Sequence, residues 1–197
     1  MIVLATTNKG KLSEIGKIFE NICSLESLDN FGFIEEPEEP YETFIENAVH
    51  KAKYYATYTK KPTLSDDAGI CIDALDGAPG VFSKRFIEEC GSVEKMFQQL
   101  ESKLDGKTKK AYFKCAAALV VPETGEIITA EGVMEGELVF PPREGGLQVY
   151  DCIFMPDGFD KTISELGLET KSKISYRSAA MNKLIDEVKK RNLNCII

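Results

Sequence analysis

The sequence predicts an α/β domain built around a mixed β-sheet. Short apolar segments typical of buried strands alternate along the chain with segments whose apolar residues recur at helical spacing. Further along, two long strand-like segments flank a Pro-Glu-Thr-Gly turn and so predict an antiparallel hairpin. Because the chain has 197 residues and no linker long enough to separate independent units, we expect residues 1–197 to form a single domain.

The first half of the chain begins with a strand and continues into an amphipathic helix. Residues 2–5 are apolar without interruption, whereas the next six are polar, small or cationic. Helical spacing follows at Leu12, Ile15, Ile18, Phe19 and Ile22. A possible short strand at 24–28 and an acidic loop at 35–42, where two prolines prevent a helix, lead into a long helix over about 44–57.

The second half alternates strands, turns and helices in the same way. A short strand at 61–65 precedes the sequence Asp-Asp-Ala-Gly at 66–69, which predicts a turn before a strand at 69–75. A glycine- and proline-rich loop covers 76–83, and a helix covers about 93–103. The remaining predicted elements are the hairpin strands 111–121 and 126–138, a loop at 141–146, a short buried strand at 152–156 and a last helix from near Ser175.

The composition argues against several classes of function. The net charge of −8 is unfavourable for general binding to nucleic acids or anionic membranes, so we expect neither as a partner. No apolar run approaches the length of a membrane span, and the N-terminus lacks a signal-peptide pattern. We therefore expect a cytoplasmic protein.

Cysteine and histidine usage restricts the possible metal chemistry. The six cysteines are scattered without a CxxC pair, so zinc-site spacing is missing. With His50 as the one histidine, a histidine-rich metal site is excluded, and so is a Ser-His-Asp triad unless His50 supplies it. Any metal would be held by carboxylates, which suits Mg²⁺ or Mn²⁺.

The polar segment at residues 6–11, where the first strand meets the first helix, has two interpretations. Thr7 or Asn8 can cap the helix by accepting a hydrogen bond from a free backbone N–H group. Lys9 and Lys11, however, oppose the helix dipole, which favours anions at this end. A bound phosphate would resolve that conflict, although the segment is not a P-loop. The segment alone leaves both interpretations open.

Three further polar clusters lie where the predicted elements begin or end. An acidic run contains Glu35, Glu36, Glu38, Glu39, Glu42 and Glu46, and such runs are usually solvated surface. The adjacent carboxylates of Asp66 and Asp67 suit a turn, but they also suit a hard cation and a base that activates water. Lys171, Lys173 and Arg177 repeat a cationic helix start. Together the clusters indicate a phosphorylated substrate and a divalent metal.

The order of these motifs resembles the inosine triphosphate pyrophosphatase family. "ATTNKGK" is similar to the family's T-x-N-x-x-K, "TFIENAVHKA" to its F-x-E-N-A-x-x-K-A helix and "LSDDAGI" to its D-D-S-G-L turn. "DGAPGVFSKRF", "VYDCIFMPDG" and "TKSKISYRSAA" resemble the G-G-x-P-G-x-x-S-A-R-[FY], G-Y-D-P-I-F and E-K-x-x-I-S-H-R-x-x-A motifs. The match runs in order from residue 2 to about residue 188.

The resemblance implies an elongated mixed sheet flanked by helices, two lobes with the site in the cleft between them, and a homodimer. It implies Mg²⁺-dependent hydrolysis of a nucleoside triphosphate, such as a non-standard purine triphosphate, to the monophosphate and pyrophosphate. Asp67 would be both the general base and a metal ligand. Glu39 would be the second metal ligand, with Glu36, Glu38 and Glu46 as alternatives. The implied substrate contacts are Thr6, Thr7, Asn8, Lys9, Gly10, Lys11, Lys51, Ala68, Gln148, Val149, Tyr150, Asp151, Lys171, Tyr176 and Arg177.

The sequence departs from the family mainly where the base would bind. Gln148 stands where the family has an aromatic residue that stacks on the base, and Leu147 or Tyr150 is a possible replacement. Tyr176 stands in place of the histidine that reads the 6-oxo group, Ala68 in place of a serine, and Cys152 in place of a proline. These changes predict altered base discrimination, and they keep open an alternative function as a nucleotide-binding protein without turnover.

Overall fold

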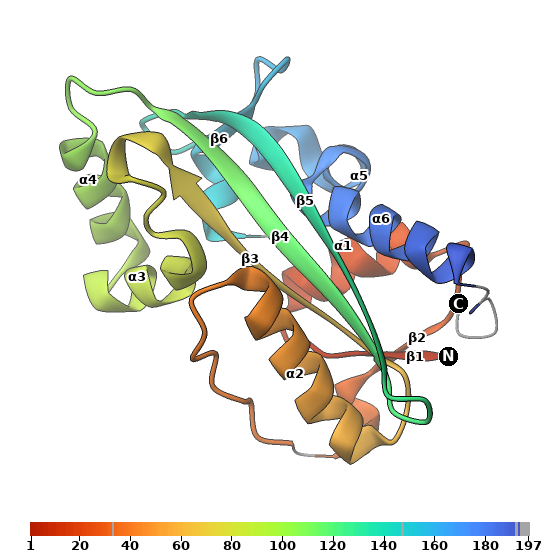
Figure 1. Ribbon diagram of the computed structural model, residues 1–197. Helices are drawn as coiled ribbons and strands as arrows, with labels where there is room; N and C mark the ends of the chain where they lie inside the picture. The colour runs from red at the N-terminus through yellow and green to blue at the C-terminus, as the bar shows by residue number, and fades with distance from the viewer. Residues whose placement is uncertain (33, 147, 192, 194–197) are drawn as a thin grey trace.

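A six-stranded mixed sheet forms the centre of the molecule, in the order β2-β1-β3-β4-β5-β6 (Figure 1). The computed structural model describes residues 1–32, 34–146, 148–191 and 193. β1 (Ile2–Leu4) is parallel to both β2 (Leu25–Ser27) and β3 (Thr63–Ile72). Antiparallel pairing then joins β3 to β4 (Lys110–Val121), β4 to β5 (Glu126–Leu138) and β5 to β6 (Phe154–Pro156). The predicted mixed sheet and hairpin are therefore confirmed.

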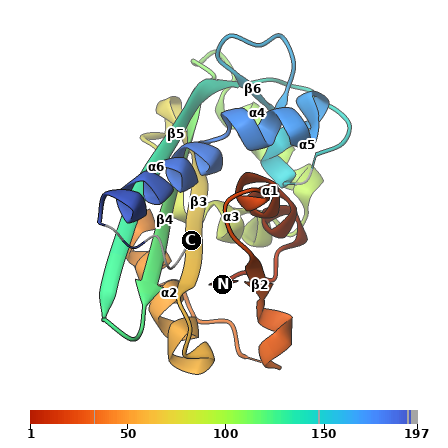
Figure 2. The same cartoon turned by 90° about the vertical axis from the view of Figure 1, so that its right-hand side faces the viewer.

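Helices cover both faces of this sheet (Figures 1 and 2). α2 (Phe44–Thr59) packs on β3 and β4 from one face, where its Ala48 and Ala52 meet Ala116 and Ala118. The other face carries a larger core, formed by α1 (Lys9–Phe19), α5 (Ile163–Ile174) and α6 (Tyr176–Lys190). This core includes β4 residues such as Ala117, which lies between Ala116 and Ala118. The even and odd residues of β4 therefore belong to different cores, as the period of a strand requires.

β3 runs without interruption through the segment that the sequence predicts as a turn. Asp66 and Asp67 pair with Ala117 and Ala116 of β4, and both carboxylates are almost fully buried. Farther along, Gly69 lets the short 3-10 helix η3 (Gly80–Phe82) approach, because a Cβ at this position would lie 2.1 Å from the Gly80 carbonyl oxygen. The predicted turn is wrong: distant cations, Lys11 and Arg177, neutralise Asp66 inside the sheet, and Asp67 accepts a hydrogen bond from Asn47 of α2.

The structure contains two helices that the sequence does not predict. α3 (Ser83–Cys90) follows η3 directly and precedes α4 (Val93–Lys103), and α5 precedes α6. Lys171 and Lys173 therefore lie in the last turn of α5, where cations favour the helix dipole, and only Arg177 lies at the start of α6. The predicted cationic start of the last helix is wrong for the two lysines. Among the described residues, no helix has the length and apolarity needed to cross a membrane.

Candidate active site

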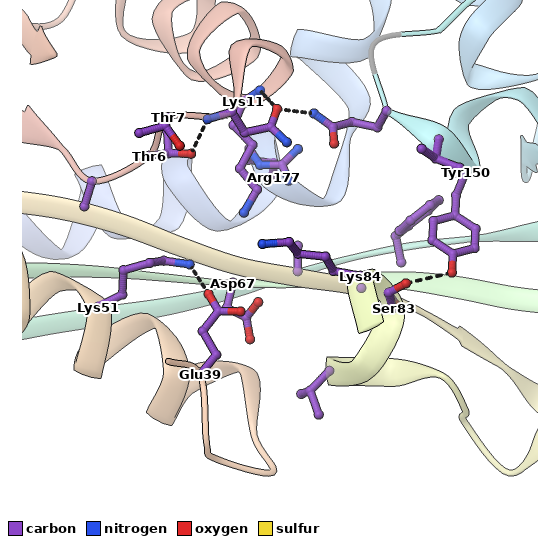
Figure 3. Close-up of a pocket in the computed structure, with 18 of the residues that line it drawn as sticks. Thr6, Thr7, Lys11, Glu39, Lys51, Asp67, Ser83, Lys84, Tyr150 and Arg177 are labelled. Carbon is purple, nitrogen blue, oxygen red and sulfur yellow. Dashed lines mark hydrogen bonds and ion pairs between the residues drawn. The ribbon is translucent and has the colours of Figure 1, made fainter. Parts of the chain in front are cut away.

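A pocket of about 420 Å³ opens where the β1–α1 loop, β3, α2, α3 and α6 meet (Figure 3). Most of the predicted site residues line this pocket: Thr6, Thr7, Asn8, Lys11, Glu39, Lys51, Asp67, Ala68, Gln148, Val149, Tyr150, Tyr176 and Arg177. Four others, Lys9, Gly10, Asp151 and Lys171, are not among its lining residues. Of the alternative metal-binding glutamates, Glu36 also lines the pocket.

Helix capping shapes the loop between β1 and α1. The Asn8 side chain is the N-cap of α1: its Oδ1 accepts a hydrogen bond from the Lys11 backbone N–H at 3.1 Å. The Asn8 backbone N–H in turn donates to Thr6 Oγ1 at 3.2 Å. Capping satisfies only one of the first N–H groups of the helix, so the positive end of the dipole remains available to an anion at the N-terminus of α1. The capping and phosphate-binding interpretations are therefore compatible.

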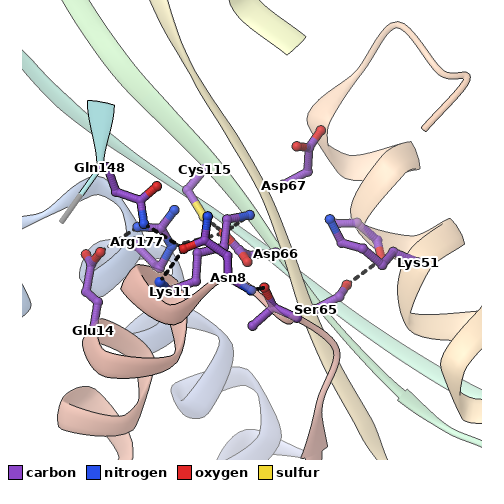
Figure 4. Close-up of polar contacts among 12 residues, drawn as sticks. Asn8, Lys11, Glu14, Lys51, Ser65, Asp66, Asp67, Cys115, Gln148 and Arg177 are labelled. Atoms are coloured by element: carbon purple, nitrogen blue, oxygen red, sulfur yellow. Dashed lines mark hydrogen bonds and ion pairs between the residues drawn. The ribbon is translucent and has the colours of Figure 1, made fainter. Parts of the chain in front are cut away.

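Asp66 and Asp67 point to opposite sides of β3 (Figure 4). Asp66 faces α1 and α6, where its Oδ2 lies 3.1 Å from Lys11 Nζ and accepts a hydrogen bond from Arg177 Nε at 2.9 Å. Arg177 also donates to Glu14 Oε2 at 2.6 Å. Burial opposes ionisation of Asp66, but the neighbouring cations outweigh it and hold the pKa of Asp66 well below its usual range. Asp66 therefore fixes the two cations at the edge of the pocket.

Asp67 faces the pocket and α2 instead. Its Oδ2 accepts a hydrogen bond from Asn47 Nδ2 at 3.2 Å, and it is 5% exposed. Burial raises the pKa of Asp67, and nearby Glu39 adds to this effect while Lys51 opposes it. A buried carboxylate with a raised pKa beside a pocket is suited to accept a proton.

Glu39 forms an ion pair with Lys51 beside Asp67, with Lys51 Nζ 2.5 Å from Glu39 Oε1. Burial opposes ionisation of Glu39, but Lys51 lowers its pKa overall, so this carboxylate stays charged. The described residues contain no group of three or more metal-binding side chains, so Asp67 and Glu39 offer two carboxylates at most. This donor set fits Mg²⁺, which commonly takes one or two protein carboxylates and completes its shell with water and substrate phosphates.

Lys171 lies inside the protein rather than beside the pocket. Its Nζ is 2.6 Å from Asp151 Oδ2 and 3.6 Å from Glu14 Oε2, and it is 2% exposed. The sequence indicates a cation here but does not say which carboxylates surround it. In this structure Lys171 and Asp151 form a buried ion pair, and neither residue is among those that line the pocket.

Phe113, Tyr150 and Tyr176 form the aromatic end of the pocket. The ring of Tyr176 stacks on Phe113 of β4, with centroids 4.5 Å apart and planes at 16°. The first turn of α6 lies directly on β5 at Gly132, where a Cβ would come within 2.2 Å of the Tyr176 carbonyl oxygen. Tyr150 Oη donates to the Ser83 carbonyl at 2.9 Å, and Leu147 lies outside the described residues. This end offers flat apolar surface with one tyrosine hydroxyl from α6.

Several pocket residues have no predicted role in the sequence. Lys84, at the start of α3, lies 3.9 Å from Glu36 and adds a solvent-exposed cation facing Lys11 across the pocket (Figure 3). Lys84 lies within the motif "DGAPGVFSKRF", and this position in a family-like motif could have identified it as a site residue. Phe113 and Ser83 were missed because their roles depend on contacts between distant elements.

Comparison with known proteins gives a consistent result. The model of the Ham1 family matches residues 2–187. The dITP/XTP pyrophosphatase of Halalkalibacterium halodurans is 39% identical, covering 92% of this chain and 95% of that protein. That of Geobacter sulfurreducens is 40% identical, covering 95% and 96%. The solved structure of a HAM1 protein from Coxiella burnetii superposes with a TM-score of 0.83 at 32% identity, covering 96% of this chain and 98% of that one.

Proposed function

This chain belongs to the Ham1 family, and we propose that it hydrolyses non-standard purine nucleoside triphosphates to the monophosphate and pyrophosphate. The substrates would be the ribo- or deoxyribonucleotides of inosine and xanthosine, as the names of its relatives suggest. One observation supports this most directly: a single pocket joins a cationic helix N-terminus, the carboxylates of buried Asp67 and half-buried Glu39, and an aromatic end. Such an enzyme would remove damaged nucleotides from the cellular pool.

The triphosphate would lie along the N-terminus of α1. The loop at residues 6–11 supplies backbone N–H groups and the helix dipole, and Asn8 and Lys11 supply side-chain donors. Lys51 and Lys84 approach from other sides of the same pocket. Cations placed around phosphates neutralise the charge that develops during phosphoryl transfer.

Asp67 and Glu39 would hold Mg²⁺, for which Mn²⁺ is a possible substitute. The ion, when bound, supplies Lewis-acid neutralisation of the phosphate oxygens. Asp67 would also take the proton of the water that attacks the α-phosphorus, and its hydrogen bond from Asn47 fixes the carboxylate for that transfer. The raised pKa of Asp67 is consistent with a proton acceptor.

The aromatic end of the pocket would take the base. Burial raises the pKa of Tyr176, so its hydroxyl stays protonated and can donate a hydrogen bond. Gln148 has no aromatic face, which leaves Phe113, Tyr150 and Tyr176 as the flat surfaces at this end. Because Gln148 and Tyr176 differ from the family pattern, we expect altered base discrimination with the same release of pyrophosphate.

A second candidate is a nucleotide-binding protein that has lost turnover, which the altered base end favours. Released pyrophosphate, measured with Mg²⁺ over a panel of standard and deaminated triphosphates, separates the two. Turnover of inosine or xanthosine triphosphate supports the enzyme, whereas tight binding without turnover of any member contradicts it. Retention of Asp67 and Glu39 favours the enzyme, since binding alone does not need a base.

The family resemblance also supports a homodimer in the cytoplasm. Light scattering coupled to gel filtration tests the dimer. The net charge of −8 makes nucleic acids and anionic membranes poor partners. Salt-sensitive retention on DNA or RNA would contradict that expectation.

A further inference from the structure

Gln148 lines the pocket and contacts the loop that precedes α1. Its Nε2 donates a hydrogen bond to Asn8 Oδ1 at 3.1 Å, although 140 positions separate the two residues (Figure 4). The same Asn8 oxygen accepts the capping hydrogen bond from the Lys11 backbone N–H, also at 3.1 Å. Asn8 Oδ1 thus has two donors from different parts of the chain.

These two hydrogen bonds determine how the Asn8 carboxamide is turned. A backbone N–H can only donate, so the oxygen of Asn8 must face Lys11 and the amide nitrogen must face away. Within the part of the chain that the structure describes, Asn8 Nδ2 has no hydrogen-bond acceptor, and Asn8 is an exposed residue lining the pocket. The amide NH₂ group is therefore available to a ligand with acceptor oxygens.

Gln148 is itself held by the buried ion pair behind the pocket. Its backbone N–H donates to Asp151 Oδ2 at 3.1 Å, and the same oxygen lies 2.6 Å from Lys171 Nζ. A chain of contacts thus connects Lys171 through Asp151 and Gln148 to Asn8. Through these contacts the buried Lys171–Asp151 pair can hold Gln148 in place without touching the substrate.

We propose that Gln148 is a positioning residue for the polyphosphate rather than a contact for the base. It acts through Asn8, by holding the Asn8 oxygen toward the helix and leaving the Asn8 NH₂ group toward the phosphates. This deepens the proposed function and rests on it, because it assigns the polyphosphate end of that same substrate to Gln148. A carboxamide cannot stack on a base as an aromatic ring does, but it can hold this hydrogen bond.

The test uses inorganic tripolyphosphate, a probe without a base, titrated calorimetrically in the presence of Mg²⁺. Gln148→Met keeps the length of the side chain and removes its donor. We expect the affinity for tripolyphosphate to fall about three- to tenfold, the range for loss of one hydrogen bond. We also expect KM to rise by the same factor for inosine and adenosine triphosphates, with kcat nearly unchanged. Gln98→Met, on the exposed face of α4, is the matched control and should change nothing.

A double-mutant cycle then decides whether Gln148 acts through Asn8. Asn8→Ala should weaken tripolyphosphate binding, and the double variant should bind no worse than Asn8→Ala alone. Three results would overturn the proposal: unchanged affinity in Gln148→Met, additive losses in the double variant, or a KM change for only one base. Failure of the proposed function is a separate outcome, since it appears as absence of pyrophosphate release by the wild-type protein while the tripolyphosphate cycle can still be measured.

Discussion

Replacement of Asp66 by asparagine should destabilise the fold strongly. Asp66 is fully buried, and its Oδ2 holds both Arg177 and Lys11 at 2.9 and 3.1 Å. An asparagine NH₂ group would point either at these cations or into the space beside Oδ1, which has no hydrogen-bond partner among the described residues. Removing one partner of a buried ion pair costs about 3–5 kcal/mol. At about 2–4 °C per kcal/mol for a chain of this size, Tm should fall by roughly 6–20 °C.

The same substitution at Asp67 should leave thermal stability intact and lower turnover instead. Burial raises the pKa of Asp67, so the folded state disfavours its ionised form. A carboxyl whose pKa rises on folding costs stability above its unfolded pKa, and this cost vanishes when both states are protonated in acid. In metal-free buffer at neutral pH, Asp67→Asn should therefore leave Tm unchanged or higher. Its turnover should fall by about 10²–10⁴-fold through loss of the base.

Both variants are assayed by thermal melting in EDTA and by pyrophosphate release with Mg²⁺, beside Asp105→Asn at an exposed position. The control should match wild type in both measurements. If Asp66→Asn melts within about 2 °C of wild type, less than about 1 kcal/mol, the buried pairing is not stabilising. If Asp67→Asn keeps activity within about threefold of wild type, far inside the expected loss, the base is a different residue.

Three other predictions concern the pocket. Lys11→Ala should raise KM for triphosphates about ten- to hundredfold, by loss of a charged contact to phosphate, and an unchanged KM would refute the loop assignment. Inosine triphosphate should be preferred over adenosine triphosphate by less than about 100-fold in kcat/KM, or ~2.7 kcal/mol. The double variant Tyr176→His/Gln148→Phe should raise this ratio of kcat/KM values. A wild-type ratio above about 100-fold that the double variant does not increase would contradict the prediction. EDTA should abolish pyrophosphate release and Mg²⁺ should restore it; activity that persists in EDTA would exclude metal dependence.

Local sequence patterns predicted those elements whose structure depends on neighbouring residues. β1, the polar loop and α1 follow from an apolar run, six polar residues and a helical repeat. The β4–β5 hairpin follows from its turn residues. β3 could not be predicted in the same way, because Asp66 and Asp67 in any local window indicate a turn. In the folded strand their partners are distant in sequence: Lys11 and Arg177 pair with Asp66, and Asn47 donates a hydrogen bond to Asp67.

The candidate site shows the same division. Asn8, Lys11 and Asp67 each stand in a polar cluster that has a local physical reason, and the family resemblance then assigned their roles. The location of Lys171 was not predictable, since a lysine at that position is equally consistent with a phosphate contact and a buried ion pair. Its partners Asp151 and Glu14 come from segments 20 and 157 positions away, and only the fold brings them together. The hydrogen bond between Gln148 and Asn8 could not be predicted either, because the two residues are 140 positions apart in the sequence.

The charges around the pocket explain why a divalent cation would belong with the substrate rather than with the empty protein. The described lining contains four cationic side chains, Lys11, Lys51, Lys84 and Arg177, and three carboxylates, Glu36, Glu39 and Asp67. Arg177 is already neutralised by the buried carboxylates of Asp66 and Glu14. Asp66 also lies 3.1 Å from Lys11 Nζ, so the described pocket has no excess positive charge to attract a polyanion. A triphosphate that enters with Mg²⁺ brings part of its own neutralisation, and the carboxylates of Asp67 and Glu39 then attract the metal instead of repelling the phosphates.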